Sequence, residues 1–212
     1  MRLTTERLIL RPWEDKDRTP MARIYGDAQV RRFHPKVLTV EEANVGIDLA
    51  IERARTNGFH FQAAELKASG EFIGMIGLAV LAEGVQAGLP GHRSVEIGWF
   101  LAKEYWGQGL APEGARAWLD YAWLIGLPEI AAFTAKVNAP SQRGMEKIGR
   151  FMIPGAITIT WSSARAIGCG LKWSTGSGIR PFSSGIPSPG DVSFSTMSAF
   201  HNSVLAAQLM VD

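Results

Sequence analysis

The sequence predicts an α/β fold in residues 1–149, followed by a Ser/Gly/Pro-rich, largely irregular tail in residues 150–212. Strand-like and helical stretches alternate up to residue 149, one strand passes through a glycine turn directly into a helix, and the composition changes abruptly near residue 150. The chain has 212 residues, of which 46% are apolar. This is enough to bury a sizeable core in one domain, or in a domain with an appendage.

The elements of the first half follow from spacing and turn signals. A capping box, Thr39-Val40-Glu41-Glu42, opens a helix that runs to Asn57-Gly58. A turn at residues 67–71 separates two strand-like runs, and Gly and Pro enrich the segment after them. The expected order is a strand at 5–13, helices at 15–25 and from the capping box to Gly58, strands at 60–66 and 72–81, and a long loop at 82–93.

The strand at residues 94–102 is the most informative feature of the chain. It leads through Gly107 and Gly109 into a helix that has Pro112 near its first position. Such a junction leaves several backbone N–H groups unpaired and directed at one point, which is how proteins bind phosphate groups. The segment therefore predicts a phosphate-binding loop, with an ordinary pair of glycines at a helix start as the alternative.

The spacing excludes two common phosphate loops. A dinucleotide-binding loop needs Gly-x-Gly-x-x-Gly and a carboxylate at the end of the next strand, whereas this loop lacks the third glycine and Glu129 opens a strand instead. A Walker loop needs Gly-Lys-Ser/Thr, which does not follow here. A nucleotide binder of the Rossmann type, which would bind NAD, is therefore disfavoured.

The elements after this loop complete the predicted domain. The helix from Pro112 ends at Gly126-Leu127-Pro128, residues 129–137 read as a strand, and Asn138 caps a final helix. The buried face of the helix from Pro112 is expected to contain Ala115, Trp118, Leu119, Ala122 and Ile125.

Three segments in this order resemble the GNAT family of acetyltransferases. The family's pyrophosphate loop has the pattern Gln/Arg-x-x-Gly-x-Gly/Ala, and its branch of RimJ/RimL type, the ribosomal-protein-alanine N-acetyltransferases, often has tryptophan before Gly-x-Gly. The first strand and the last helix of that branch are similar to residues 5–13 and 138–149. The matching loop here is Trp106-Gly107-Gln108-Gly109-Leu110-Ala111.

The resemblance implies a mixed, mostly antiparallel central sheet flanked by helices, and transfer of an acetyl group from acetyl-CoA to a primary amine by direct attack. The acceptor is then an amine-bearing small molecule or a protein N-terminus. The backbone around residues 99–101 is expected to bind the pantetheine arm, and residues 106–111 the diphosphate. The coenzyme-binding residues so implied are Trp99, Phe100, Leu101, Trp106, Gly107, Gln108, Gly109, Leu110, Ala111 and Asn138.

Glu96 is the candidate general base, because alternation in the strand points it to the face opposite its apolar neighbours Val95 and Ile97. The alternative is a glutamate paired with an arginine on the sheet surface. Many members of the resembled family have a tyrosine as acid where this chain has Met145, and methionine cannot donate a proton. In the resembled N-terminal acetyltransferases the position of Ser141 serves as donor to the leaving sulfur, so the resemblance implies Ser141 in that role. Ser141 and Asn138 have a structural alternative each, as a first-turn serine and as a helix cap that satisfy backbone N–H groups.

Several further residues fit either the site or the scaffold. Trp13, Phe33, His34 and Trp99 line an acceptor pocket or belong to the core, which is the commoner place for aromatic residues. The pair Arg31-Arg32 is interpreted as a solvated turn, and His60 as a histidine at a strand end.

The tail has a different character from the domain. Residues 1–150 contain 37 charged side chains, whereas residues 151–212 contain five. The family's usual charged ending is absent after Gly149, yet residues 151–161, back-translated and read one base earlier, permit Ile-His-Asp-Pro-Gly-Gly-Asp-Tyr-Asp-His-Leu, which resembles it. A frameshift near Arg150 is the hypothesis, and a natural low-complexity extension is the alternative. In the frameshift case residues 157–161 alternate well enough to form an edge strand by chance.

Composition limits the partners. The net charge of +2 predicts no nucleic-acid partner, and no long apolar run predicts a membrane span. The first residues lack the features of a secretory signal, so a cytoplasmic location is expected. A single Cys169 excludes an internal disulfide, and no metal site is predicted. The competing function is a CoA-binding protein of the same fold that has lost turnover.

Overall fold

A computed structural model describes residues 1–83, 86, 94–135, 137–149 and 158–162, with only the backbone described in the last range. Most of the loop expected at residues 82–93 and nearly all of the tail expected at residues 150–212, including Cys169, lie outside the described residues.

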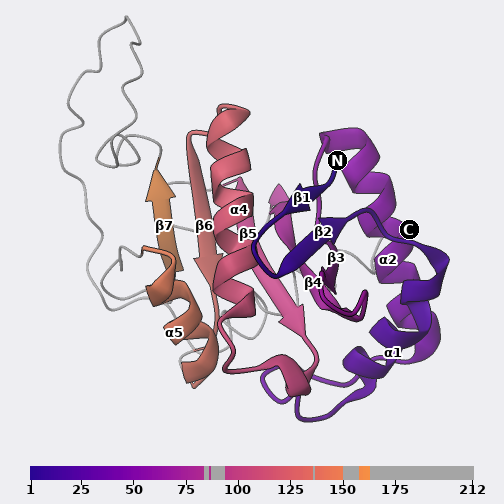
Figure 1. Cartoon of the computed structure of the whole chain (residues 1–212). Helices are drawn as coiled ribbons and strands as arrows, with labels where there is room; N and C mark the ends of the chain where they lie inside the picture. Colours follow the sequence, from indigo (N-terminus) through magenta and orange to yellow (C-terminus); the bar gives the residue numbers. More distant parts are fainter. Residues whose placement is uncertain (84–85, 87–93, 136, 150–157, 163–212) are drawn as a thin grey trace, which may run out of the picture.

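The strands form one sheet in which spatial order follows chain order from β1 to β7. Neighbouring strands are antiparallel, except that β5 and β6 run parallel. The α/β class and the mostly antiparallel sheet predicted from the sequence are therefore confirmed (Figure 1). The strands are β1 (Leu3–Thr4), β2 (Leu8–Arg11), β3 (Gln62–Leu66), β4 (Phe72–Val80), β5 (Val95–Leu101), β6 (Glu129–Phe133) and β7 (Thr158–Ser162).

The helices begin and end at recognisable signals. The Thr39 hydroxyl accepts a hydrogen bond from the Glu42 amide, and the Glu42 carboxylate accepts one from the Thr39 amide, which confirms the predicted capping box. The same helix stops at Gly58, whose φ of 81° is left-handed. The helical elements are η1 (Asp15–Asp17), α1 (Arg18–Gly26), α2 (Val40–Asn57), η2 (Lys103–Tyr105), α4 (Leu110–Leu124) and α5 (Ala139–Lys147).

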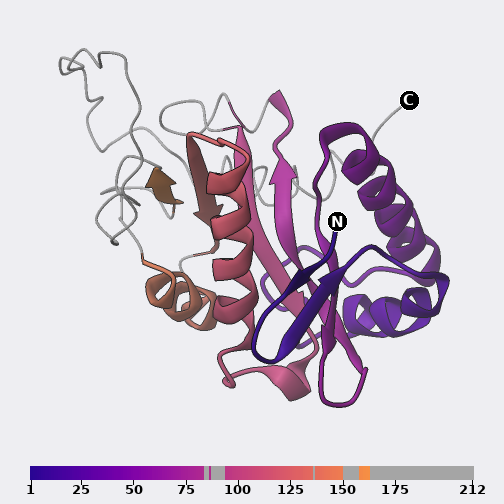
Figure 2. The same cartoon turned by 45° about the horizontal axis from the view of Figure 1, so that its top comes forward.

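Two apolar clusters lie on the two faces of the sheet. The cluster on one face packs α4 against the sheet around the fully buried Trp118, and includes Ile76 and Ile97. The cluster on the other face packs α1 and α2 against Met75 and Phe61. Figure 2 shows α4 and α5 on one side of the sheet, and α1 and α2 on the other.

Some boundaries differ from the sequence-based expectation. The strand expected at residues 5–13 is found as β2, which stops at Arg11 because Pro12 has no N–H to donate to a strand ladder. The sixth strand ends at Phe133 rather than at residue 137. The expected helix at 15–25 starts as the 3-10 turn η1, and the edge strand that was considered at 157–161 is found as β7, one residue later.

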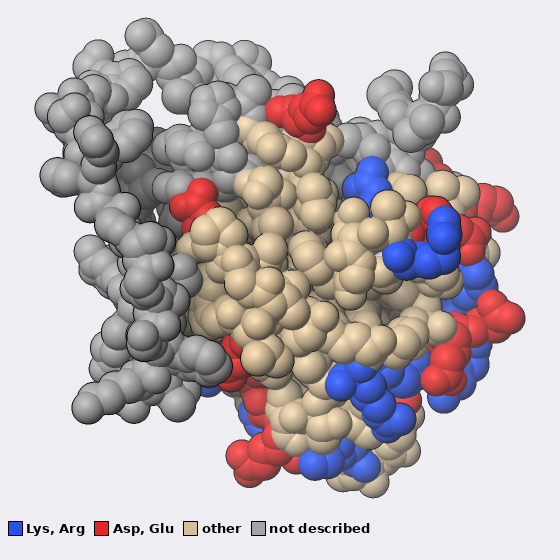
Figure 3. Space-filling model, turned by 90° about the horizontal axis from the view of Figure 1, so that it is seen from above, with Lys and Arg blue, Asp and Glu red and all other residues tan. Residues whose placement is uncertain are grey.

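Charged side chains of both signs are mixed on the surface over α1 and α2, and the centre of the same view is uncharged (Figure 3). Within the part of the chain that the structure describes, no helix combines the length and the apolar character that crossing a bilayer requires.

Candidate active site

A cavity of about 290 Å³ opens at the end of the sheet where β5 and β6 point toward the first turns of α4 and α5. Its wall combines the strand residues Glu96 and Trp99, the loop residues Gly107 and Gly109, and Ser141 of α5. The segment after α1, residues 30–34, contributes the remaining side. The cavity thus brings together most of the residues that the sequence assigned to a site.

The cavity exists because β5 is paired very differently on its two sides. On the β4 side the register is continuous from Val95 to Leu101, whereas on the β6 side the only pairing is between Glu96 and Ala131. The bonds from the Leu81 amide to the Ser94 carbonyl and from the Ala102 amide to the Ile73 carbonyl fix which groups face β4. By alternation the N–H groups of Glu96, Gly98 and Phe100 face β4.

The N–H groups of Trp99 and Leu101 therefore face the widening gap between β5 and β6. The Leu101 carbonyl faces the same gap and accepts a hydrogen bond of 2.8 Å from the Trp106 indole. The cavity wall includes both Trp99 and Leu101. These two amides are donors that the sheet leaves available for a ligand.

The loop between β5 and α4 forms the second group of donors. Gly107 and Gly109 have left-handed φ values of 76° and 79°, which explains why glycine occupies both positions. The first intrahelical bond of α4 runs from the Glu113 amide to the Gly109 carbonyl, so the amides of Leu110 and Ala111 precede the helix ladder. Among the described residues, no backbone hydrogen bond is donated from positions 107–111.

Gln108 differs from the other residues of this loop. It is absent from the cavity wall, its side chain donates to the Glu104 carbonyl at 2.8 Å, and its carbonyl accepts from Arg7 at 2.9 Å. Its contacts are those of a residue that holds the loop in shape. The other predicted loop residues, from Trp106 to Ala111, lie on the wall.

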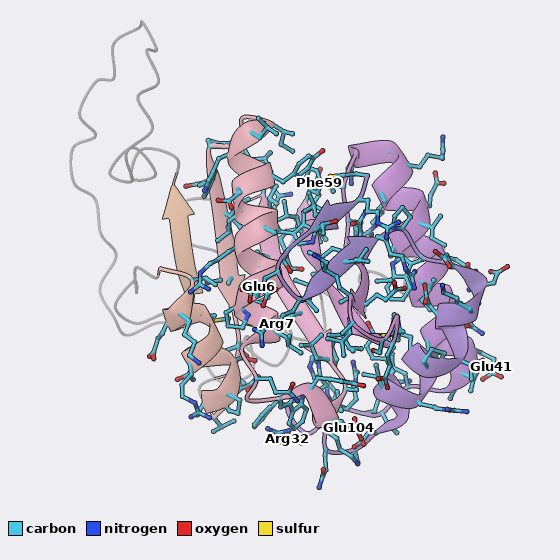
Figure 4. The ribbon with its side chains drawn as sticks, in the orientation of Figure 1. Glu6, Arg7, Arg32, Glu41, Phe59 and Glu104 are labelled. Atoms are coloured by element: carbon cyan, nitrogen blue, oxygen red, sulfur yellow. The ribbon has the colours of Figure 1, made fainter. Side chains whose placement is uncertain are left out.

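Glu113 in the first turn of α4 would place a negative charge next to the loop, and Arg7 compensates it. The guanidinium of Arg7 donates to the Glu113 carboxylate at 2.7 Å, and the Arg7 amide donates to it at 2.8 Å. Partial burial acts to raise the pKa of Glu113, but hydrogen bonds from Thr5 and Arg7 hold it below its usual value. Figure 4 shows Arg7 next to the start of α4.

Glu96 lies at the last position where β5 and β6 still pair. The residue is 6% exposed, and its Oε1 has no hydrogen-bond partner among the described residues. Burial raises the pKa of Glu96 to about 8. The alternative of a surface glutamate paired with an arginine is therefore wrong, and the carboxyl is set up to exchange a proton near neutral pH.

The start of α5 holds the remaining candidates. Asn138 accepts a hydrogen bond from the Ser141 amide at 3.3 Å and donates one to Thr134 Oγ1 at 2.9 Å, so its capping role is present. Ser141 lines the cavity and is half-buried. Met145 is 3% exposed and lies on the wall, where it can donate no proton. Gly144 gives room to Trp99, whose ring would lie 3.1 Å from a Cβ at that position.

The aromatic residues divide between the two roles considered for them. Phe33, His34 and Trp99 line the cavity, and the His34 ring lies 4.8 Å from the Phe100 ring. Trp13 belongs to the scaffold, because it packs with the α1 and α2 cluster and its indole donates to the Phe61 carbonyl at 2.9 Å.

The interpretation of Arg31-Arg32 as a solvated turn is wrong for Arg31. Arg31 is 4% exposed and its guanidinium carbon lies 5.6 Å from the Tyr25 ring centre, while Arg32 is exposed but lines the cavity. His60 lies before β3, which starts at Gln62, rather than at the strand end as expected. It is 1% exposed, and burial lowers its pKa to about 4.

Sequence reasoning missed some residues of the cavity wall. Phe61 and Met75 alternate with other apolar residues in strands and were indistinguishable from core. Arg143 and Lys147 are exposed on the wall at a spacing of four, which places them on one face of α5 and was a usable signal.

Solved structures share this fold. An acetyltransferase from Agrobacterium tumefaciens str. C58 is 22% identical with a TM-score of 0.67, covering 77% of this chain and 95% of that chain. RimJ of Mycobacterium smegmatis, solved in complex with CoA-disulfide, is 20% identical with a TM-score of 0.58, covering 74% of this chain and 83% of that chain. At these identities the likeness establishes the fold alone.

Sequence relatives establish the family. YnaD of Bacillus subtilis (strain 168), an uncharacterized N-acetyltransferase, is 31% identical over 151 residues, which are 70% of this chain and 82% of YnaD. YkkB of the same organism is 30% identical over 150 residues, covering 70% of this chain and 84% of YkkB. A family model described as an acetyltransferase (GNAT) domain matches residues 7–150. The cavity between the separating strands, the glycine loop and these matches lead to one conclusion: the chain belongs to the GNAT acetyltransferase family.

Proposed function

We propose that this protein transfers the acetyl group of acetyl-CoA directly to a primary amine. The observation that carries the proposal is the buried Glu96 carboxyl, whose Oε1 has no partner among the described residues, on the wall of the cavity that also contains the open amides of the loop. An amine must lose a proton to attack a thioester, and the diphosphate of the coenzyme needs donors such as the open amides.

In this mechanism Glu96 accepts the proton that the amine loses, directly or through a water molecule. The amine nitrogen forms a bond to the acetyl carbonyl carbon, and the carbon–sulfur bond then breaks. The amides of Trp99 and Leu101, which face the gap between the strands, bind the pantetheine arm and stabilise the oxyanion. The backbone of Phe100 continues the same segment of the wall.

Ser141 is proposed to donate the proton that the leaving thiolate takes up, because its half-buried side chain lies on the cavity wall. The products are then an N-acetylated amine and free CoA. Glu96 releases the proton it accepted to bulk water and Ser141 takes one up from bulk water, so both side chains return to their starting states. Asn138 is proposed to contact the coenzyme while it caps α5. The proposed acceptor is an amine-bearing small molecule or a protein N-terminus, which membership of the family supports.

Release of CoA thiol from acetyl-CoA in the presence of a panel of primary amines tests the proposal. Turnover with at least one amine, together with mass-spectrometric detection of the acetylated product, is expected. Calorimetric binding of CoA without turnover on any amine or N-terminal peptide would favour the competing function, a CoA-binding protein that has lost catalysis.

A further inference from the structure

We infer that Arg32 binds the diphosphate of the coenzyme from across the cavity and thereby links the acceptor-side segment, residues 30–34, to coenzyme binding. This inference rests on the proposed function, because it assumes that CoA occupies the cavity. It adds a residue from outside the glycine loop, and it adds a physical coupling between the two halves of the site.

Arg32 reaches across from the segment after α1 and stacks on the glycine loop. Its guanidinium carbon lies 4.7 Å from the Trp106 ring centre and 4.5 Å from that of Phe33. Trp106 is a fixed platform, because its indole donates to the Leu101 carbonyl at 2.8 Å. Figure 4 shows Arg32 next to the η2 segment that carries Glu104.

The charge of Arg32 is available for a ligand. Two other cations near the loop already have carboxylate partners: Arg7 lies 2.7 Å from Glu113 and Lys103 lies 2.8 Å from Asp27. Among the described residues Arg32 has no carboxylate partner, and its guanidinium donates a hydrogen bond to the Gln29 carbonyl at 2.6 Å. A guanidinium has five N–H donors, so most of them remain free.

The position of Arg32 suits a diphosphate. Arg32, Gly107, Gly109 and Ala111 line one cavity, so an anion bound to the loop amides meets a cation whose planar N–H groups match phosphate oxygens. The backbone amides bind the anion without a full opposing charge, whereas Arg32 supplies one. Stacking on Trp106 holds the guanidinium plane and reduces the entropy lost on binding.

The segment that carries Arg32 also forms the acceptor side of the cavity. His34 packs on Phe100, whose side chain shares a face of β5 with that of Glu96. A second contact, the ion pair between Asp27 and Lys103 of η2, also holds the segment after α1 next to the loop before α4. A diphosphate bound to Arg32 therefore holds this segment against the coenzyme loop and positions the acceptor wall.

Binding of three ligands to the full chain tests the inference: CoA, dephospho-CoA, which lacks the 3′-phosphate, and pantetheine, which lacks the diphosphate. Arg32→Ala should weaken CoA and dephospho-CoA alike by about tenfold, equal to about 1.4 kcal/mol at 25 °C, and leave pantetheine unchanged. The CoA affinity of Arg32→Lys should lie between those of wild type and Arg32→Ala. Arg55→Ala is the matched control, because Arg55 is an exposed arginine on α2 paired with Glu52.

Each other outcome has a definite meaning. Equal CoA binding by wild type and Arg32→Ala overturns this inference alone, whereas a wild type that binds no CoA overturns the proposed function as well. A loss that also affects pantetheine indicates a structural role, and a loss confined to CoA assigns Arg32 to the 3′-phosphate. Both would overturn the inference. Hydrogen exchange at residues 30–34 should slow on adding CoA in wild type and not in Arg32→Ala, and an unchanged wild-type rate would refute the coupling.

Discussion

The two sides of β5 show how one strand serves both stability and function. Toward β4 it pairs at seven consecutive positions, and toward β6 at the single position of Glu96. Alternate residues of one strand supply the backbone groups of both edges, so the difference in pairing comes from how closely each neighbouring strand follows β5. The paired side fixes the strand, and the separated side leaves amides that the sheet does not pair and that a ligand can bind. The site therefore uses hydrogen-bonding capacity that a continuous sheet would have consumed.

The largest expected effect is on catalysis, and it comes from removing the carboxyl of Glu96, where β6 begins to separate from β5. Glu96→Gln keeps the shape and burial of the side chain but removes the base, so kcat should fall by roughly 100- to 1,000-fold. CoA affinity should stay within about twofold, because Glu96 lies outside the glycine loop. Steady-state kinetics and calorimetry measure the two quantities. A kcat close to wild type would exclude Glu96 as the base.

The pH profile tests the same carboxyl in the unmodified protein. Because burial raises the pKa of Glu96 from 4.5 to about 8, kcat/KM should rise with pH and level off above about pH 8. A weakly basic amine as acceptor keeps the titration of the substrate out of this range. The control is Glu96→Gln, whose profile should lack this step.

The free energy of unfolding should fall as the pH rises, whereas kcat/KM should increase. The folded state holds its proton at a pH where the unfolded Glu96 has lost it, so the stabilising contribution of the neutral carboxyl is complete below about pH 4.5 and lost as the pH rises through about 8. Denaturant unfolding of wild type relative to Glu96→Gln should show this loss between these two values. A flat difference would contradict a buried, neutral Glu96.

A substitution at Gly74 should disrupt the pairing of β4 with β5. A Cβ on Gly74 would lie 2.1 Å from the Phe100 carbonyl oxygen, and the φ of Gly74 is 135°. Gly74→Ala should therefore cost about 3 kcal/mol of unfolding free energy, from strain and forced separation of β4 and β5. Gly107→Ala is the matched comparison, because Gly107 also has a positive φ but no atom within 4 Å of the added Cβ. It should cost about 1 kcal/mol.

Urea unfolding curves measure both glycine variants. If Gly107→Ala proves as destabilising as Gly74→Ala, the close packing of β4 against β5 is not what distinguishes the two positions.

The fold and the position of the glycine loop could be predicted because both depend on local signals. The capping box at Thr39 and the glycines at 107 and 109 determine backbone geometry within a few residues. The separation of β5 from β6 has no such local signal, because it depends on how two strands that are distant in sequence pair. They pair at Glu96 and Ala131 and separate beyond that point. The burial of Arg31 could not be predicted for the same reason, because Arg31 lies over the ring of Phe100, which is distant in sequence. The frameshift in the tail stays a prediction that the nucleotide sequence tests.

The smallest expected effect is on stability and concerns the cap of α5, the helix that follows β6. Asn138→Ala removes the cap of α5 and the hydrogen bond to Thr134, so unfolding free energy should fall by about 1 kcal/mol. Asn138→Asp keeps an acceptor for the Ser141 amide and should restore most of that loss. The pair of variants separates the two roles of this residue, because a cap needs only an acceptor. If Asn138 also donates to the coenzyme, CoA affinity stays reduced in Asn138→Asp although stability recovers.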